Sequence, residues 1–321
     1  MGQMSGFLDS AQLKVLKNTL EASLCNYKIQ KTESSGEKTE RENEELLEAF
    51  LAAKKIEGCS DKTLKYYKAT ITNLLEQLSM LVQAISTADL RQYLSDYQSK
   101  KNAGKVTIDN MRRIFSSFFA WLEDEDYIVK SPVRRIHRVR TDTLLKETIS
   151  DECLEILRDS CTEIRDLAMI DILASTGMRV GELVKMNISD INLQERQCIV
   201  FGKGNKEREV YFNARTKVHL EQYLKQRRDD NPALFVTFAS PHTRLTISGV
   251  EVRVRTLGRR VNQQKIHPHK FRRTVATQAI DKGMPIEQVQ RLLGHAKIDT
   301  TLHYAMVNQN NVKMSHRKYL G

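Results

Sequence analysis

Residue types that can bind, attack and protonate a phosphate recur in four segments of the sequence. The segments are STGMRVGEL (175–183), FGKGNKER (201–208), HPHKFRRTVAT (267–277) and LLGHAKIDTTLHYAMV (292–307). Taken singly, each has an ordinary structural explanation, such as a turn, a hairpin tip or a buried histidine. Taken together, they hold a set suited to transferring a phosphoryl group to a tyrosine. The set is Arg179, Lys203, His269, Arg272, His295 and Tyr304.

This order and spacing resembles the tyrosine recombinase (phage integrase) family, whose active site reads Arg, Lys, His-x-x-Arg, His, Tyr. His295 and Tyr304 are nine positions apart, as in that family. The resemblance implies a Xer-like or mobile-element site-specific recombinase that cuts and rejoins DNA through a 3′-phosphotyrosine intermediate. Integration or excision of an element, dimer resolution and DNA inversion are all compatible with the sequence, which does not reveal the DNA target.

The chemistry of strand transfer explains why these residue types are needed. Transfer without hydrolysis requires a covalent intermediate that keeps the energy of the phosphodiester, and a tyrosine phenolate attacking phosphorus provides one. The attack builds negative charge on the non-bridging oxygens, which fixed cations must offset in a water-poor site. Arginine suits this task, because its planar fork bonds two phosphate oxygens and stays charged. We therefore expect Arg179 and Arg272 to clamp the phosphate.

The other members of the set have expected roles in proton transfer and positioning. Lys203, on a hairpin, would protonate the leaving alkoxide as general acid, with Lys206 as the alternative. His269 precedes Arg272 by three residues, so on a helix both project to the same side. It would bond the phosphate or assist the proton leaving the tyrosine, and His295 would bond a non-bridging oxygen. Glu182 resembles the acidic partner of the family and would orient Arg or His side chains.

One position departs from the family pattern. After His-x-x-Arg the family often carries another His, whereas here Arg273 follows Arg272. Spacing favours Arg272 as the clamp, and Arg273 is expected to contact the neighbouring backbone or pack on the surface. The sequence leaves open which of the two arginines faces the phosphate.

The sequence predicts no metal and no nucleotide cofactor. His267, His269 and His303 invite a metal-site interpretation, but two-metal phosphoryl transfer needs converging carboxylates, and these segments offer Arg and Lys. The GKG at 202–204 lacks the other residues of a phosphate-binding loop and joins two predicted strands rather than opening a helix.

The elements that must position these residues indicate a mainly α fold with a small antiparallel sheet, an α+β class. Apolar residues at three-and-four spacing predict four helices before residue 127, one of them capped by Ser60. Alternating or apolar segments at 188–194, 197–204 and 208–213 predict strands.

We expect four regions along the chain, the last three named by the family resemblance. They are a helical or flexible N-terminal extension (1–42), a helical core-binding, SAM-like DNA-binding domain (43–129), a basic linker (130–147) and a catalytic domain with a C-terminal tail helix (148–321). The polar run 32–45 lacks apolar periodicity and predicts a linker or a frayed helix.

Basic residues gather in the linker and in the helix before the third catalytic segment. The stretch 130–146 holds six basic residues against one acidic, and 251–273 holds eight against one. Such segments are expected to lie along phosphates. The predicted DNA contacts are Arg134, Arg135, Arg138, Arg140, Arg253, Arg255, Arg259, Arg260 and Arg273.

Composition agrees with a nucleic-acid partner. The 321 residues carry 51 Lys and Arg against 40 Asp and Glu, a net charge of +11, and such basic proteins usually meet a polyanion. No apolar run approaches the roughly 20 residues of a membrane span, and the N-terminus has no signal pattern. Five scattered cysteines without CxxC spacing favour reduced thiols in a cytoplasmic protein.

The resemblance also implies an assembly, and it leaves rival functions to be tested. A tetramer holding two double-stranded DNA sites is expected, with an accessory directionality protein as a further partner. The tail after Tyr304 would dock in a neighbouring subunit or pack in cis. A type IB topoisomerase-like enzyme shares the tyrosine chemistry, and a catalytically inactive DNA-binding protein could share the fold.

Overall fold

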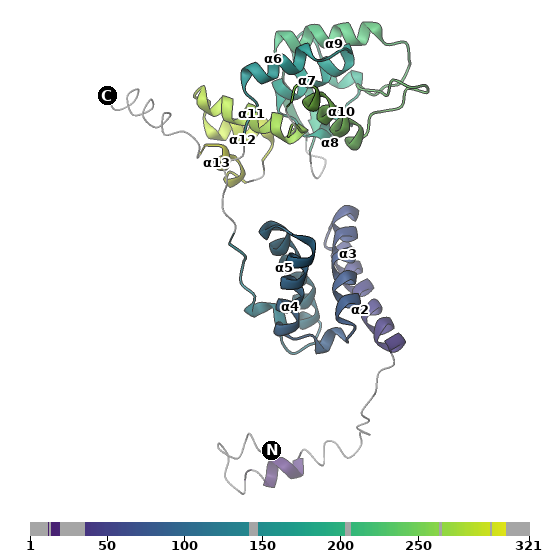
Figure 1. The fold of residues 1–321 in the computed structure, drawn as a ribbon, viewed down its shortest axis with the longest axis vertical. Coiled ribbons are helices and arrows are strands. Elements are labelled where there is room, and N and C mark those ends of the chain that lie inside the picture. Colours follow the sequence, from purple (N-terminus) through teal and green to yellow (C-terminus); the bar gives the residue numbers. More distant parts are fainter. Residues whose placement is uncertain are drawn as a thin grey trace, which may run out of the picture. The chain divides into compact units, whose positions relative to one another are not determined.

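The computed structural model describes residues 12, 14–19, 36–140, 147–202, 207–262, 265–295 and 297–305. It divides the chain into two compact units, Met1–Thr143 and Leu144–Gly321, whose elements are drawn in Figure 1. No helix among the described residues is long and apolar enough to cross a membrane.

Residues 36–140 of the first unit form a helical bundle with two 3-10 turns (Figure 1). Serine caps fix two of the helix starts, because Ser60 Oγ accepts from Thr63 N and Ser86 forms a capping box with Asp89. The core is rich in aromatic residues, with Phe50 and Phe118 fully buried. The elements are α2 (Gly36–Ile56), α3 (Asp61–Leu78), η2 (Val82–Ala84), α4 (Thr87–Lys101), α5 (Lys105–Asp124) and η3 (Pro132–Arg135).

Helix α2 starts earlier than apolar periodicity indicates. The run 32–45 predicts a linker or frayed helix, yet the helix is continuous from Gly36. Asn43 explains part of the difference: its side chain is buried, donates to Met80 O and accepts from Val82 N. These are tertiary contacts of a polar residue, and a search for apolar spacing does not detect them.

The first part of the basic linker packs on the bundle. The backbone N of Val139 donates to Asp109 on α5, and Arg91 on α4 donates to the backbone O of Arg135. Ile136 and Val139 pack against the core of the first unit. Because the apolar residues face inward, the arginines between them face outward, and residues 131–140 form a strap on this unit.

The second unit combines helices with one small sheet. Its helices are α6 (Asp151–Asp159), α7 (Ile164–Thr176), α8 (Val180–Leu183), α9 (Ala214–Gln226), α10 (Ile247–Arg260), α11 (Pro268–Asp281), α12 (Ile286–Leu293) and α13 (Asp299–Ala305), with the 3-10 turn η4 (Ile188–Asp190). The predicted fold class, mainly α with a small antiparallel sheet, is confirmed.

The sheet has the order β1-β2-β3 and is antiparallel throughout. Its strands are β1 (Ile191–Asn192), β2 (Gln197–Phe201) and β3 (Glu207–Tyr211). The first strand is shorter than the alternation predicts, because Asp190 accepts from the backbone N of Asn187 and closes a 3-10 turn ahead of it. On β3, Val210 is buried and Arg208 is half-buried, while their neighbours on the strand are exposed.

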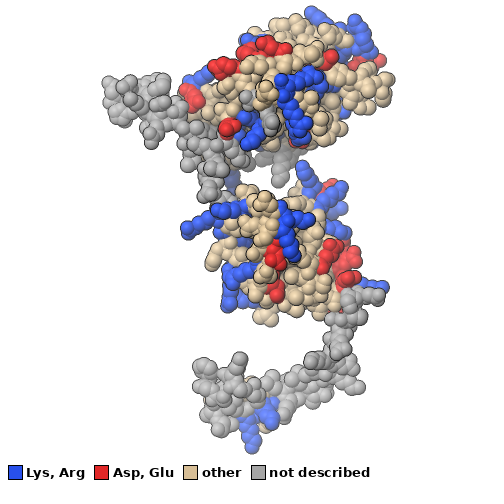
Figure 2. Space-filling view, viewed as in Figure 1, with Lys and Arg blue, Asp and Glu red and all other residues tan. Residues whose placement is uncertain are grey.

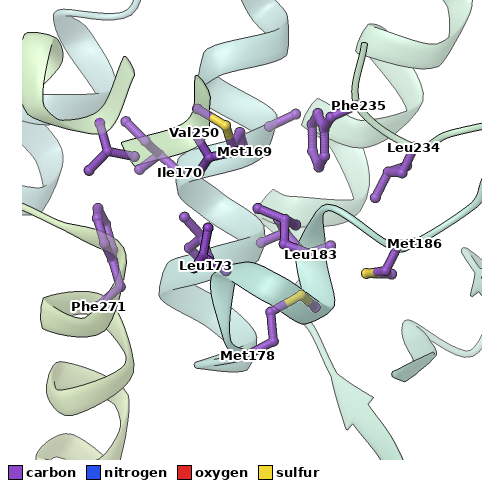
Figure 3. Packing of buried hydrophobic residues seen from close by; sticks show 14 of the residues in the cluster. Met169, Ile170, Leu173, Met178, Leu183, Met186, Leu234, Phe235, Val250 and Phe271 are labelled. Carbon is purple, nitrogen blue, oxygen red and sulfur yellow. The ribbon is translucent and has the colours of Figure 1, made fainter. Parts of the chain in front are cut away.

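Helix α7 lies at the centre of the second core, between α9 and α11. Figure 3 shows Met178 and Phe271 among the buried residues around it. Each is 1% exposed, and each directly precedes a predicted clamp residue, Arg179 or Arg272. The apolar neighbour of each arginine is thus fixed in the core, which restricts where the guanidinium can lie.

Candidate active site

Arg179 stands at the N-cap position of α8, just after α7 ends at Gly177. Its Nη1 donates to Glu182 Oε1 at 2.8 Å, and its Nη2 donates to the backbone O of Gly294 at 2.9 Å. The side chain keeps 36% of its exposure. Arg179 is therefore oriented by the protein and still faces solvent.

Glu182 is the buried centre of this arrangement, with 3% of its side chain exposed. It accepts from the Arg179 guanidinium and backbone N, and from both Nη atoms of Arg208 at 2.8 and 2.9 Å. Burial by itself would raise the pKa of the carboxyl, but these hydrogen bonds and charges hold it below the ordinary value. Glu182 in this state holds the guanidinium groups of Arg179 and Arg208.

Arg272 projects from α11 into the protein, with only 3% of the residue exposed. Its Nη1 donates to the backbone O of Gly177 at 2.8 Å, and its Nη2 bonds the backbone O of Leu293. Arg273 takes the other direction and donates to the backbone O of Glu147 at 2.8 Å. Of the two arginines that spacing leaves in competition, Arg272 lies on the side of Gly177 and α12.

Three arginines from different elements meet the C-terminal end of α12. Consecutive carbonyls of Leu292, Leu293 and Gly294 accept from Arg208, Arg272 and Arg179, respectively. The last carbonyls of a helix lack intrahelical partners, and the helix dipole makes this end negative. Cations are therefore stabilised there, and the end of α12 gathers the positive charge of the site.

Two glycines permit this close approach. Gly294 ends α12 at φ +64°, and a Cβ there would lie 2.9 Å from Cδ of Arg208. Gly177 ends α7 at φ +61°, and a Cβ there would lie 3.2 Å from Leu293 and Val275. Glycine suits both positions, because it tolerates a left-handed backbone and carries no Cβ that would clash with these neighbours.

His295 follows this helix end directly. Its Nδ1 is 2.9 Å from Oγ1 of the buried Thr301 on α13, which fixes the plane of the ring. Burial and the charges of Arg272, Arg179 and Arg208 lower the pKa of His295 to about 4. The ring is therefore neutral at neutral pH, so one of its two nitrogens carries a proton that it can donate in a hydrogen bond.

His269 lies one turn before Arg272 on α11 and is exposed. Partial desolvation by the surrounding protein, together with the charges of Arg272 and Arg179, lowers the pKa of this histidine. The role of His269 therefore stays a prediction.

The remaining two predicted catalytic residues are only partly described. Tyr304 lies on α13, in the same short helix as Thr301, and its side chain lies outside what the structure describes. Lys203 and its alternative Lys206 lie outside the described residues, between the end of β2 and the start of β3. Their roles remain predictions.

Arg208 belongs to the site and is not among the predicted site residues. It lies in the second segment, FGKGNKER, five residues after Lys203. Only contacts over long sequence separations reveal it, because its partners Glu182 and Leu292 are 26 and 84 residues away. One local signal was present: residues two apart on a strand share a face, so Arg208 lies on the same side of β3 as the buried Val210.

The arginines predicted to contact DNA differ in their exposure and in their ion pairs. Most are exposed and lie on the strap or α10: Arg134, Arg135, Arg138, Arg140, Arg255, Arg259 and Arg260. Arg134 is exposed but pairs with Glu123 at 2.8 Å, and the half-buried Arg253 forms an ion pair with Asp166, which is buried in the second unit. Figure 2 shows Lys and Arg side chains on the visible face of both units.

Comparison with known proteins gives a family. The phage integrase family model matches residues 144–311, and the model of the phage integrase N-terminal SAM-like domain matches residues 46–128. The tyrosine recombinase XerD of Oceanobacillus iheyensis is 33% identical over 294 residues, covering 86% of this chain and 98% of the relative. The tyrosine recombinase XerC of Herpetosiphon aurantiacus is 31% identical over 287 residues, covering 83% and 92%.

A solved structure shares the fold. The XerH site-specific recombinase, bound to a palindromic difH substrate in a post-cleavage complex, matches with a TM-score of 0.68 at 20% identity. The match covers 98% of this chain and 91% of that chain. All six residues of the predicted catalytic set fall within residues 144–311, the range of the larger family match.

Proposed function

The chain belongs to the phage integrase family of tyrosine recombinases, and we propose on that premise that it is a site-specific DNA recombinase. It cuts one strand at a time by attack of Tyr304 on a phosphodiester, forms a 3′-phosphotyrosine and releases a 5′-hydroxyl. A 5′-hydroxyl from another duplex then displaces the tyrosine, so each strand is rejoined without an external energy source.

The observation that carries this proposal is the convergence of arginines at the end of α12. Arg179 and Arg272 both bond carbonyls there, and His295 follows in the next position. Each Nη of an arginine has two N–H groups, so one can hold a carbonyl while the other bonds phosphate. Helix α13, which carries Tyr304, begins four residues after His295.

Proton transfer completes the proposed chemistry. His269, which is exposed one turn before Arg272 on α11, bonds the phosphate or accepts the proton of Tyr304. Lys203 protonates the leaving 5′-oxygen as general acid. The neutral His295 donates a hydrogen bond to a non-bridging oxygen, and the charge that builds there is offset by Arg179 and Arg272.

The proposed partner is double-stranded DNA, bound by exposed arginines of the strap and of α10. A reciprocal exchange of two duplexes needs four strand cuts, and each tyrosine can hold one strand. The working assembly is therefore a homotetramer on two sites, in the cytoplasm, with an accessory protein setting direction.

A capture experiment identifies the site. Full-length protein is incubated with fragmented DNA of the organism that carries the gene and then denatured with detergent, and DNA that stays bound to protein is sequenced. We expect one short sequence to be enriched, because only a covalent bond survives denaturation.

A plasmid assay then separates recombination from its two rivals. Two direct repeats of the captured sequence on one supercoiled plasmid should yield two smaller circles. Relaxation of plasmids that lack the sequence, without new circles, would indicate a topoisomerase. DNA binding with no covalent product would indicate an inactive member of the family and contradict the proposal.

A further inference from the structure

Arg208 uses all three nitrogen positions of its guanidinium within the protein. Nη1 and Nη2 grip the two oxygens of Glu182, and Nε donates to the backbone O of Leu292 at 3.2 Å. Only 13% of its side chain is exposed. Because both Nη atoms are already bonded to one carboxylate, this arginine is better suited to holding Glu182 than to binding phosphate.

The partners of Arg208 belong to different elements of the site. Glu182 lies on α8 and also holds Arg179, whereas Leu292 lies on α12, three residues before His295. Arg208 itself lies on β3, which follows the segment with Lys203. One side chain therefore ties together three elements that each carry or adjoin a proposed catalytic residue.

The geometry requires an arginine at this position. A lysine has one nitrogen and cannot bond both Glu182 oxygens and the Leu292 carbonyl as a planar fork does. Without Arg208, Glu182 would keep Arg179 as its cationic partner, and the Leu292 carbonyl would lose its donor. Arg179 would then be drawn toward Glu182 and away from the backbone O of Gly294.

We propose that Arg208 is a positioning residue for strand cleavage, which sets Arg179 through Glu182 and sets His295 through the end of α12. This inference rests on the proposed function, because the positioned groups are the proposed phosphate ligands. Small displacements of such ligands slow chemistry strongly, whereas groups that bind DNA elsewhere keep their contacts. Cleavage should therefore suffer more than DNA binding.

The test compares Arg208→Gln and Arg208→Lys with wild type and with Arg215→Gln. Arg215 pairs with Glu155 on the protein surface, so its loss removes one positive charge outside the site. The substrate is a nicked duplex bearing the captured sequence, from which the released 5′-hydroxyl fragment diffuses away. The rate of covalent adduct formation at saturating DNA and the Kd for DNA are measured separately.

We expect Arg208→Gln to slow adduct formation by about 10- to 100-fold with little change in Kd, and Arg208→Lys to fall between it and wild type. Arg215→Gln should match wild type. The double variant Arg208→Gln/Glu182→Gln should react more slowly than wild type by a factor smaller than the product of the two single factors, because both substitutions remove the same contact.

A wild-type rate in Arg208→Gln at saturating DNA would overturn the inference, whether or not its Kd for DNA has changed. If Arg208→Gln does not fold, a wild-type rate in the lysine variant has the same meaning. Failure of the wild type to form any adduct would instead contradict the proposed function, so the two outcomes are distinct.

Discussion

The arginines of the site differ in how far each is exposed, and this difference separates those that can meet a phosphate from those that hold the backbone. Arg179 keeps 36% of its side-chain exposure, Arg208 keeps 13%, and Arg272 is 3% exposed. The most exposed of them is best placed to meet an incoming phosphate. The two more buried ones hold the backbone that surrounds it, and Arg272 can add an N–H from the interior.

The sequence predicts a set of residues for the site but gives little information about the contacts among them. Spacing favoured Arg272 over Arg273, and the structure directs Arg272 toward α12 and Arg273 toward Glu147. Arg208 was missed because its importance arises from partners that only folding brings near. Tyr304 is one of ten tyrosines. It was distinguished by its position nine residues after His295, downstream of the other members of the set.

His295 gives a prediction about stability and pH. Its pKa is about 4 in the folded chain, against 6.5 for an ordinary histidine. Between these values the unfolded chain binds a proton that the folded chain does not, so stability falls as pH drops from 6.5 toward 4. Replacing His295 with Gln removes this contribution, and the unfolding temperature should then fall less over that window.

Calorimetry of the full chain between pH 4 and 7 measures this effect in the second unit. His137→Gln serves as the control, because His137 is exposed on the strap of the first unit. In the His137→Gln variant, the unfolding temperature of the second unit should keep its wild-type dependence on pH. An unchanged pH dependence in the His295 variant would show that this ring is not held neutral by folding.

At the scale of elements, the end of α12 organises the site, and Gly294 makes that possible. Asparagine tolerates the left-handed backbone better than other non-glycine residues, but a Cβ at this position would meet Arg208 at 2.9 Å. We expect Gly294→Asn to displace Arg208 and to slow adduct formation by about 10-fold or more. The measurement is the single-turnover rate on the nicked duplex.

Gly283 provides a matched control for backbone strain. It also has a positive φ, +88°, but a Cβ there would meet nothing within 4 Å. Gly283→Asn should therefore keep the wild-type rate. If both variants lose the same share of the rate of adduct formation, the effect is due to backbone strain. If both keep the wild-type rate, Arg208 tolerates the displacement.

Periodicity predicted most elements because their apolar faces are buried in regular helices and strands. It failed where polar contacts decide the structure, as at Asn43 in α2 and at Asp190 before β1. Residues 131–140 carry little periodicity, so the contacts that hold the strap on the first unit could not be predicted. Its anchors, such as Asp109 to Val139, are single hydrogen bonds between distant residues.

At the scale of the whole molecule, the net charge of +11 indicated a polyanionic partner before any site was considered. The structure refines that expectation for single residues, since Arg253 is paired with the buried Asp166 while Arg138 and Arg140 are exposed on the strap. Charge counts could not separate these cases, because pairing with buried acids depends on the fold.

Mapping the residue that becomes linked to DNA tests the central claim most directly. Trypsin releases Tyr304 in the peptide 298–313, which contains no other tyrosine, whereas Tyr211 and Tyr319 fall in different peptides. After reaction of the full chain with the nicked duplex and nuclease digestion, mass spectrometry should find the remaining nucleotide on 298–313, and Tyr304→Phe should give no adduct. A nucleotide on another tyrosine peptide, or an adduct in Tyr304→Phe, would contradict the account.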